Sequence, residues 1–187
     1  MLVDLSLKVT KAHMKMAMDY GKMEHLGHLG THFDVMDKEF PLEYTSREAI
    51  VFDVSDIENR DIEISDIDIN KVKEGMFVAF YTNVINKLDY GTKEYFEGNR
   101  NLSKDLIKEL VKRGVAIIAI DCCGIRAGKE HDLADQYCAD NNAFVVENLC
   151  NLEKILNGEK HKSFKANTYP INFVDITGLP CRVIGEL

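Results

Sequence analysis

The feature that most constrains the fold of this chain is a helix–strand unit near its middle. The segment L-S-K-D-L-I-K-E-L-V-K-R-G (102–114) repeats apolar residues at the three- and four-residue spacing of a helix with one buried face. Ser103 can cap the start of this helix, and Gly114 can end it. The run V-A-I-I-A-I-D (115–121) that follows is apolar on both faces, as in a strand covered on both sides. The unit predicts an α/β protein.

Weaker patterns extend this prediction in both directions along the chain. Strands are expected at 2–9, 49–54, 76–81 and 143–149, and helices near 130–141 and just before Gly158. The tail from 171 returns to a strand pattern, with a turn expected at Gly178. The segment 10–24 carries no readable pattern and is expected to be a loop that influences specificity. Because no linker or repeat is visible, we expect one domain over residues 1–187.

The composition excludes several classes of partner. The chain has 187 residues, 45% of them hydrophobic, and a net charge of −8. An acidic chain lacks the basic face that nucleic acid or an anionic membrane requires, so we expect neither partner. No apolar run is long enough for a membrane span, and the N-terminus does not look like a signal peptide. Five irregularly spaced cysteines indicate reduced thiols, and hence a cytoplasmic protein.

The histidine-rich segment H-L-G-H-L-G-T-H-F-D-V-M-D (25–37) is a candidate metal site. On a straight strand His28 and His32 would lie roughly 13 Å apart, too far to share one ion. On a helix these two histidines could chelate together, but Asp34 would point elsewhere. The three side chains can converge only if the backbone bends between the histidines, and Gly30 is placed to allow that bend.

Two imidazoles and one carboxylate form a ligand set typical of hydrolytic metal sites with a position left for water. From spacing alone, the alternative is that these histidines are ordinary surface or core residues. His25 could be a fourth ligand or a solvated side chain.

Several stretches resemble motifs of one family. H-L-G-T-H-F-D (28–34) resembles the H-x-G-T-H-x-D signature of the metal-dependent cyclase family, which contains bacterial kynurenine formamidases and isatin-hydrolase-like enzymes. Further agreements follow in family order: V-D-L-S (3–6), Y-T (81–82), D-Y-G…Y-F (89–96), G-V-A-I-I-A-I-D (114–121), V-E-N-L-C-N-L (146–152) and G-L-P-C-R-V (178–183).

This resemblance implies a swivelling β/β/α fold with a mixed sheet and flanking helices, and a homo-oligomer, dimeric or tetrameric. It also implies an arylformamidase-like hydrolase that acts on a carbon–nitrogen bond of a small amide or cyclic amide by metal-activated water. His28, His32 and Asp34 match the ligands of a first ion, Zn²⁺ or Mn²⁺. Glu147 matches the carboxylate that supports a second metal or the catalytic water. A divalent ion suits this chemistry because it acidifies water and polarises a carbonyl.

The chain departs from the family signature just after these ligands. The signature usually continues to a further histidine that is a ligand or general base, and here that position is Lys38, with Met36 in place of the preceding proline. A protonated lysine cannot ligate a metal. Asp37 or Glu39 could supply a carboxylate instead, or could be ordinary loop charges.

A second departure lies upstream of Glu147. The position of a family histidine is occupied here by Asp135. If this segment is helical, His131 and Asp135 share one face and can act together, His131 as a catalytic helper and Asp135 as a ligand. The alternative is an ordinary solvated helix face.

Two further candidates lie after the central strand. Arg126 in C-G-I-R-A-G-K could bind a substrate carboxylate from a loop, or could be an ordinary exposed basic residue. Cys122 and Cys123 could be buried thiols, or one of them could be a nucleophile, although no base is evident beside them.

Three functional hypotheses therefore remain. The preferred hypothesis is a metal-dependent hydrolase of small amides in which Glu147 and His131 handle the attacking water. The alternative is a family member that binds a metal or small molecule without catalysis, which the lysine at position 38 motivates. A thiol enzyme is the third hypothesis, and it would be indifferent to chelators.

Overall fold

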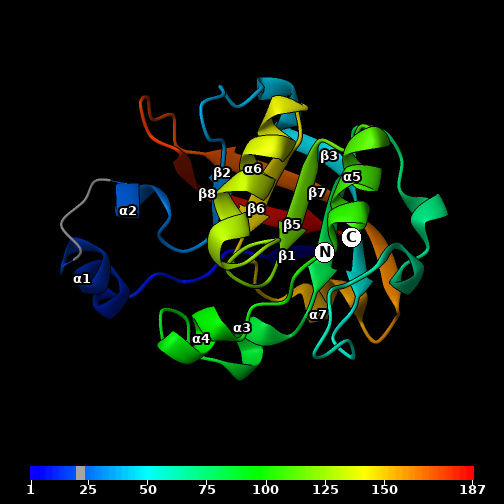
Figure 1. The fold of residues 1–187 in the computed structure, drawn as a ribbon, viewed down its shortest axis with the longest axis horizontal. Coiled ribbons are helices and arrows are strands. Elements are labelled where there is room, and N and C mark those ends of the chain that lie inside the picture. Colours follow the sequence, from blue (N-terminus) through cyan, green and yellow to red (C-terminus); the bar gives the residue numbers. More distant parts are fainter. Residues whose placement is uncertain (20–23) are drawn as a thin grey trace.

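α-Helices separate successive strands between Phe77 and Pro170, as the helix–strand unit predicts, whereas only 3₁₀ turns or loops connect the strands between His32 and Tyr81 (Figure 1). The computed structural model describes residues 1–19 and 24–187, without the side chains of Glu24 and His25. The strands are β1 (Leu2–Asp4), β2 (His32–Asp34), β3 (Ser46–Asp53), β4 (Phe77–Tyr81), β5 (Ile117–Ile120), β6 (Phe144–Glu147), β7 (His161–Pro170) and β8 (Gly178–Glu186). The α-helices are α1 (Lys11–Asp19), α2 (Glu24–Gly27), α3 (Val84–Lys87), α4 (Lys93–Glu97), α5 (Lys104–Lys112), α6 (His131–Asp140) and α7 (Leu152–Leu156).

These strands form a single mixed sheet that closes on itself. The order is β1-β8-β2-β6-β5-β4-β3-β7, and a further pairing of β7 with β8 closes seven of these strands into a ring, with β1 attached to β8 outside it. The neighbours β3, β4, β5 and β6 run parallel, whereas β2, β7 and β8 pair antiparallel. Helices flank this barrel-like sheet, with α5 and α6 over one of its sides (Figure 1). The expected mixed sheet with flanking helices is confirmed.

The central strand β5 is buried on both faces, as its apolar sequence predicts. Ile118 and Ile120 pack in a cluster that includes Leu106 and Leu110 of α5. Ile117 faces the other way, into the cluster that fills the closed sheet. Each such side chain contributes about 1.5–3 kcal/mol by leaving water, so the hydrophobic effect holds the sheet between two apolar layers.

The helix before β5 has the ends that its sequence predicts. The Ser103 hydroxyl accepts a hydrogen bond from the backbone N–H of Leu106 at 3.1 Å and thus caps α5. Gly114 ends the helical segment at φ +71°, a conformation that side chains disfavour.

The two chain ends meet in the sheet. β1 pairs antiparallel with β8, and Arg182 donates two hydrogen bonds to the Asp4 carboxylate at 3.0 and 2.8 Å. Two of the family-like stretches, separated by most of the sequence, are therefore in direct contact. Among the described residues, no helix is both long and apolar enough to cross a membrane.

Three local predictions were wrong. The first strand ends at Asp4 rather than continuing to residue 9, because the Leu7 amide donates to the Thr31 hydroxyl instead of to a neighbouring strand. Residues 11–19 form helix α1 rather than a loop.

The expected turn at Gly178 was also wrong. Gly178 begins β8, and the connection from β7 spans 171–177. The position needs glycine because a Cβ there would lie 2.8 Å from the backbone of Gly27. Close packing, not a turn, explains this glycine.

Candidate metal centre

Strand register assembles the centre of the candidate site. β2 and β6 pair antiparallel with His32 directly opposite Glu147. Asp34 lies two residues beyond His32 and therefore points to the same face of the strand. All three residues are buried. The sheet thus gathers an imidazole and two carboxylates from segments far apart in the sequence.

His28 joins them because the chain bends after α2. Gly30 adopts φ +72°, which provides the bend that the spacing requires. The imidazole rings of His28 and His32 are 5.0 Å apart. Their Nε2 atoms lie 3.2 and 3.5 Å from Oδ1 of Asp34. The structure therefore brings these three predicted ligands together.

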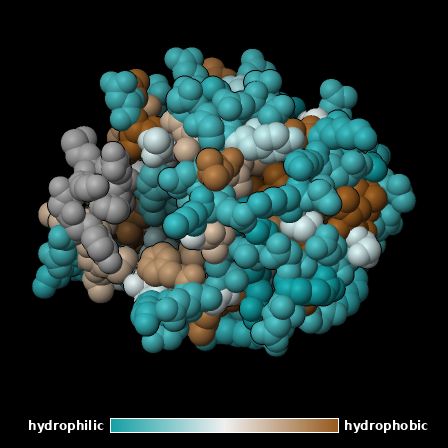
Figure 2. Space-filling model, viewed as in Figure 1, coloured by the Kyte–Doolittle hydropathy of each residue, from teal (hydrophilic) through white to brown (hydrophobic). Residues whose placement is uncertain are grey.

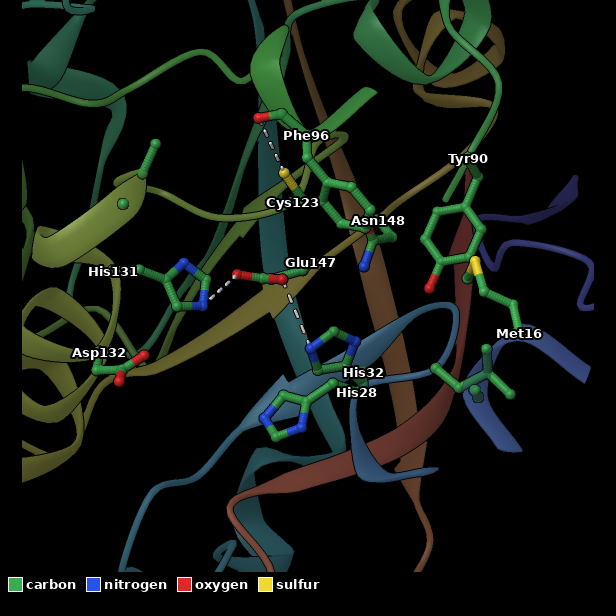
Figure 3. A pocket seen from close by; sticks show the side chains of 14 residues that line it. Met16, His28, His32, Tyr90, Phe96, Cys123, His131, Asp132, Glu147 and Asn148 are labelled. Carbon is green, nitrogen blue, oxygen red and sulfur yellow. Dashed lines mark hydrogen bonds and ion pairs between the residues drawn. The ribbon is translucent and has the colours of Figure 1, made fainter. Parts of the chain in front are cut away.

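Helix α6 supplies a second trio. His131 and Asp135 are one turn apart, and His131 Nε2 lies 3.5 Å from Oδ2 of Asp135 and 3.7 Å from Oε1 of Glu147. Oε2 of the same Glu147 lies 3.5 Å from His32 Nε2 (Figure 3). Each trio, His28–His32–Asp34 and His131–Asp135–Glu147, could hold an ion. Glu147 lies between the two.

Backbone carbonyls orient two of the imidazoles. His32 Nδ1 is 2.9 Å from the Gly30 oxygen, and His131 Nδ1 is 3.1 Å from the Arg126 oxygen. Because a carbonyl only accepts, each Nδ1 carries a proton, which leaves Nε2 as the nitrogen that would bind a metal ion once it is deprotonated. This second contact is typical of metal-ligating histidines.

A buried asparagine that the sequence analysis missed supports His32. Asn148 Nδ2 donates to the Gly30 oxygen at 2.9 Å, and Asn148 Oδ1 accepts from the Tyr95 hydroxyl at 2.7 Å. Tyr95, Asn148, Gly30 and His32 thus form one hydrogen-bonded chain. The only sequence signal was the position of Asn148 directly after Glu147.

The carboxylates experience conflicting electrostatic forces. Burial raises the pKa of Asp34, but the charges and hydrogen bonds of His32 and His28 outweigh it and hold that pKa well below its usual range. Burial, together with the charge of Asp34, raises the pKa of both Asp135 and Glu147 well above the ordinary values. Three close carboxylates in a dry environment repel one another, and a bound cation would relieve that repulsion.

Unsatisfied polar atoms mark the same place. Five buried side-chain nitrogen and oxygen atoms of the described residues have no hydrogen-bond partner, and four of them belong to the two trios: His32 Nε2, Asp34 Oδ2, Asp135 Oδ1 and Glu147 Oε1. Buried polar atoms are ordinarily paired, so such a cluster indicates a ligand-binding site. Imidazole nitrogens with carboxylate oxygens suit Zn²⁺ or Mn²⁺. The residues present therefore fit a divalent metal.

A cavity of about 420 Å³ opens onto these ligands. His28, His32, His131 and Glu147 lie on one side of it, and Met16, Tyr90 and Phe96 lie across from them (Figure 3). None of the described residues that line it is a lysine or an arginine. The cavity suits a small molecule with an apolar body and no need for a cationic partner.

The structure does not bring Arg126 into this cavity. Its side chain is 11% exposed and binds Asp61, Glu130 and the Leu102 carbonyl. The guanidinium is therefore already paired, and the structure gives no support to the expectation that it binds a substrate carboxylate. The part of Arg126 that contacts the site is its carbonyl oxygen, which accepts from His131.

Lys38 also points away from the ligands. Its ammonium group pairs with Asp37 at 3.0 Å and with Asp140 at 2.8 Å, and these hydrogen bonds raise its pKa. A charged amine held at the surface does not replace the family histidine, and Asp37 is held by the same pair. The side chain of His25 lies outside the described residues.

The two adjacent thiols are poor nucleophiles at neutral pH. Burial raises the pKa of Cys122 well above its usual value and that of Cys123 to about 11. Cys123 does line the cavity. Its protonated thiol does not favour the thiol-enzyme hypothesis.

Comparisons with solved structures find the same fold. A potential metal-dependent hydrolase with cyclase activity aligns at a TM-score of 0.76 and 18% identity, covering 99% of this chain and 96% of that one. A predicted metal-dependent hydrolase from Bacillus stearothermophilus aligns at 0.74 and 18%, covering 99% and 97%. An isatin hydrolase bound to the product analogue thioisatinate aligns at 0.70 and 17%, covering 85% and 71%.

A comparison with curated proteins finds no match. The family model described as "Putative cyclase" matches residues 3–127. That match spans more than half of the chain and includes His28, His32 and Asp34. This chain therefore belongs to the cyclase family.

Proposed function

We propose that this protein is a metal-dependent hydrolase that opens a carbon–nitrogen bond in a small amide or cyclic amide, as an arylformamidase does. The observation that carries the proposal is the cluster of unsatisfied buried ligand atoms at the floor of a small-molecule cavity. The similarity to an isatin hydrolase supports the choice of a cyclic amide as a substrate class.

The candidate metal ligands and the candidate proton carriers overlap at Glu147. His28, His32 and Asp34 would hold the first ion, Zn²⁺ or Mn²⁺, and Asp135 with Glu147 would hold a second ion if one binds. A bound ion supplies Lewis acidity, which acidifies water and polarises a carbonyl oxygen.

The proton of the attacking water needs an acceptor beside the cavity. Glu147 has a raised pKa and an oxygen 3.7 Å from His131 Nε2, so the carboxylate can take the proton and share it with the imidazole. His131 then donates toward the leaving nitrogen. Its Nδ1 contact with the Arg126 carbonyl keeps the ring in the orientation for this transfer.

Turnover of a defined set of amides tests the proposal. Protein freed of metal with a chelator and reloaded with Zn²⁺ or Mn²⁺ is assayed with isatin, formanilide and other cyclic amides. We expect hydrolysis of at least one compound by the loaded protein and none by the metal-free protein. Turnover that is equal in both preparations would contradict a metal-dependent reaction.

Lys38 motivates the second candidate, a family member that binds a small molecule without catalysis. The family's usual base is absent at this position, and the lysine there is engaged by Asp37 and Asp140. In the same assay, thermal stabilisation by these compounds without turnover of any of them would favour the binder.

A further inference from the structure

The cavity contains one side-chain hydroxyl whose proton has no acceptor among the described residues. Tyr90 lies in the turn between α3 and α4 and lines the cavity together with His32 and Glu147. Its oxygen accepts a hydrogen bond from the Gly30 amide at 2.9 Å. A tyrosine hydroxyl both donates and accepts. Because the Tyr90 oxygen already accepts from Gly30, its O–H can donate to a ligand in the cavity.

The other donors around the cavity are engaged. His32 and His131 donate from Nδ1 to backbone carbonyls. The Asn148 side chain donates to the Gly30 oxygen, and its own oxygen accepts from the Tyr95 hydroxyl. The Cys123 thiol, a weak donor, faces oxygens outside the ligand cluster. Tyr90 is thus the donor best placed to meet a ligand.

Packing fixes the Tyr90 ring. His13 contacts it edge-to-face at 5.2 Å, and Tyr95 does so at 5.5 Å. The hydroxyl end is directed into the cavity, on the side away from His131 (Figure 3). A donor held in this way loses little freedom when it binds a ligand, which is the requirement for stabilising charge in a transition state.

We infer that the Tyr90 hydroxyl donates a hydrogen bond to the carbonyl oxygen of the amide substrate. This inference rests on the proposed function. As the water oxygen bonds to the carbonyl carbon, the π electron pair moves to the carbonyl oxygen, and the water proton moves to Glu147 and from there to Nε2 of His131. When the carbonyl forms again, the carbon–nitrogen bond breaks and the nitrogen takes a proton from His131. Tyr90 keeps its own proton throughout.

Protonation of Tyr90 is compatible with this role. Burial raises its pKa, and the nearby Glu147 charge acts in the same direction. The hydroxyl is therefore neutral over the whole range in which an amide hydrolase would be assayed. It supplies a donor where Lys38, turned to the surface, cannot.

The first test is Tyr90→Phe, which keeps the ring contacts and removes only the hydroxyl. We expect kcat for isatin to fall by about 10²-fold, with bound metal and thermal midpoint close to those of the wild type. Tyr44→Phe is the matched control, since its hydroxyl donates to the Asn142 carbonyl at an exposed position, and it should leave kcat unchanged. An unchanged kcat in Tyr90→Phe would overturn the inference. A large loss of bound metal would also overturn it, because Tyr90 would then act only through Gly30 and His32.

A binding experiment separates this inference from the proposed function. The affinity of the metal-loaded protein is measured for isatin and for indoline, a similar ring without carbonyl groups. Loss of one neutral hydrogen bond should weaken isatin binding by about 3- to 10-fold in Tyr90→Phe and leave indoline binding unchanged. Equal effects on both ligands, or no binding of isatin by the wild type, would overturn the inference. Selective weakening without turnover would support Tyr90 as the donor while contradicting the hydrolase.

Discussion

At the scale of single residues, His32 links the two trios of candidate ligands. Its Nε2 lies 3.5 Å from both Asp34 and Glu147. Replacement of His32 by alanine should therefore remove bound metal and turnover together. Elemental analysis of protein purified without added metal measures the first, and the amide assay measures the second. His161→Ala, in β7 beside the Phe52 ring, is a histidine control outside the trios. Full retention of metal by His32→Ala would refute the ligand assignment.

Replacement of Lys38, unlike that of His32, should affect neither bound metal nor turnover. Its partners Asp37 and Asp140 lie at the surface, and exposed ion pairs contribute little. Lys38→Ala should keep its full metal content and its turnover, as judged by the same two measurements. If turnover disappears while metal remains, Lys38 acts as the base despite its raised pKa, and the role given to Glu147 and His131 is wrong.

Cys123 allows a pH-dependent test of the thiol hypothesis. Its pKa of about 11 leaves the thiol protonated at pH 7, and only the thiolate reacts with iodoacetamide. Alkylation of the folded protein at pH 7 should be roughly two orders of magnitude slower than for a free cysteine of pKa about 8.5, and should accelerate as the pH approaches 11. Mass spectrometry of the peptide that contains Cys122 and Cys123 follows the reaction. Rapid alkylation at pH 7 with loss of activity would favour a thiol enzyme.

At the scale of elements, local sequence patterns predicted most of the strands. The arrangement of the candidate metal ligands depends instead on which strands pair with one another, and in which register. The double-sided burial of β5 and the capped helix α5 follow from side-chain periodicity within a dozen residues. The bend at Gly30 follows from the requirement that His28 and His32 converge. The register of β2 against β6 does not follow, because it depends on which strands meet in the closed sheet.

The sequence analysis assigned no role to two supporting residues for the same physical reason. Tyr95 and Asn148 lie in family-like stretches, but the sequence assigns them no role, because their role depends on contacts between distant elements. The pairing of Arg126 could not be predicted from the sequence for a related reason. A basic residue in a loop cannot be known to be paired until the Asp61 segment is placed beside it.

The hydrogen-bonded chain from Tyr95 to His32 predicts an effect on metal binding from a residue that touches no metal. Asn148→Ala removes the amide that holds the Gly30 carbonyl, and loss of such support typically costs 10- to 100-fold in metal affinity. Asn151→Ala is the matched control, because Asn151 has a similar backbone (φ 59° against 57°) but donates to the exposed Asp4 carbonyl. Calorimetric titration with Zn²⁺ compares the two. Equal affinities in both variants would show that the Gly30 contact does not orient His32.

At the scale of the whole molecule, exposed apolar side chains gather at one end. Met14, Met18 and Leu26 lie on α1 and α2, while Phe173 and Val174 lie in the connection between β7 and β8. These elements occupy the same end of the fold (Figure 1), and α2 contacts β8. The visible remainder of this face is largely hydrophilic with separate apolar patches (Figure 2). Exposed apolar side chains that gather in one region of a protein commonly mark an interface.

We propose that this end pairs with a second copy of the chain, since homo-oligomers commonly associate through the same surface of each subunit. Val174 is 81% exposed, so Val174→Asp should leave the monomer fold intact and place a charge in the interface. Light scattering coupled to gel filtration should show a dimer or tetramer for the wild type and a smaller species for this variant. Leu42→Asp is the control, because Leu42 is 80% exposed in a 3₁₀ turn (Leu42–Thr45) ahead of β3, and it should keep the wild-type mass. A monomeric wild type, or the same mass for Val174→Asp as for the wild type, would contradict an interface at this end. Because Met16 of α1 and His28, which directly follows α2, line the cavity, assembly here would bring the second copy close to the substrate entrance.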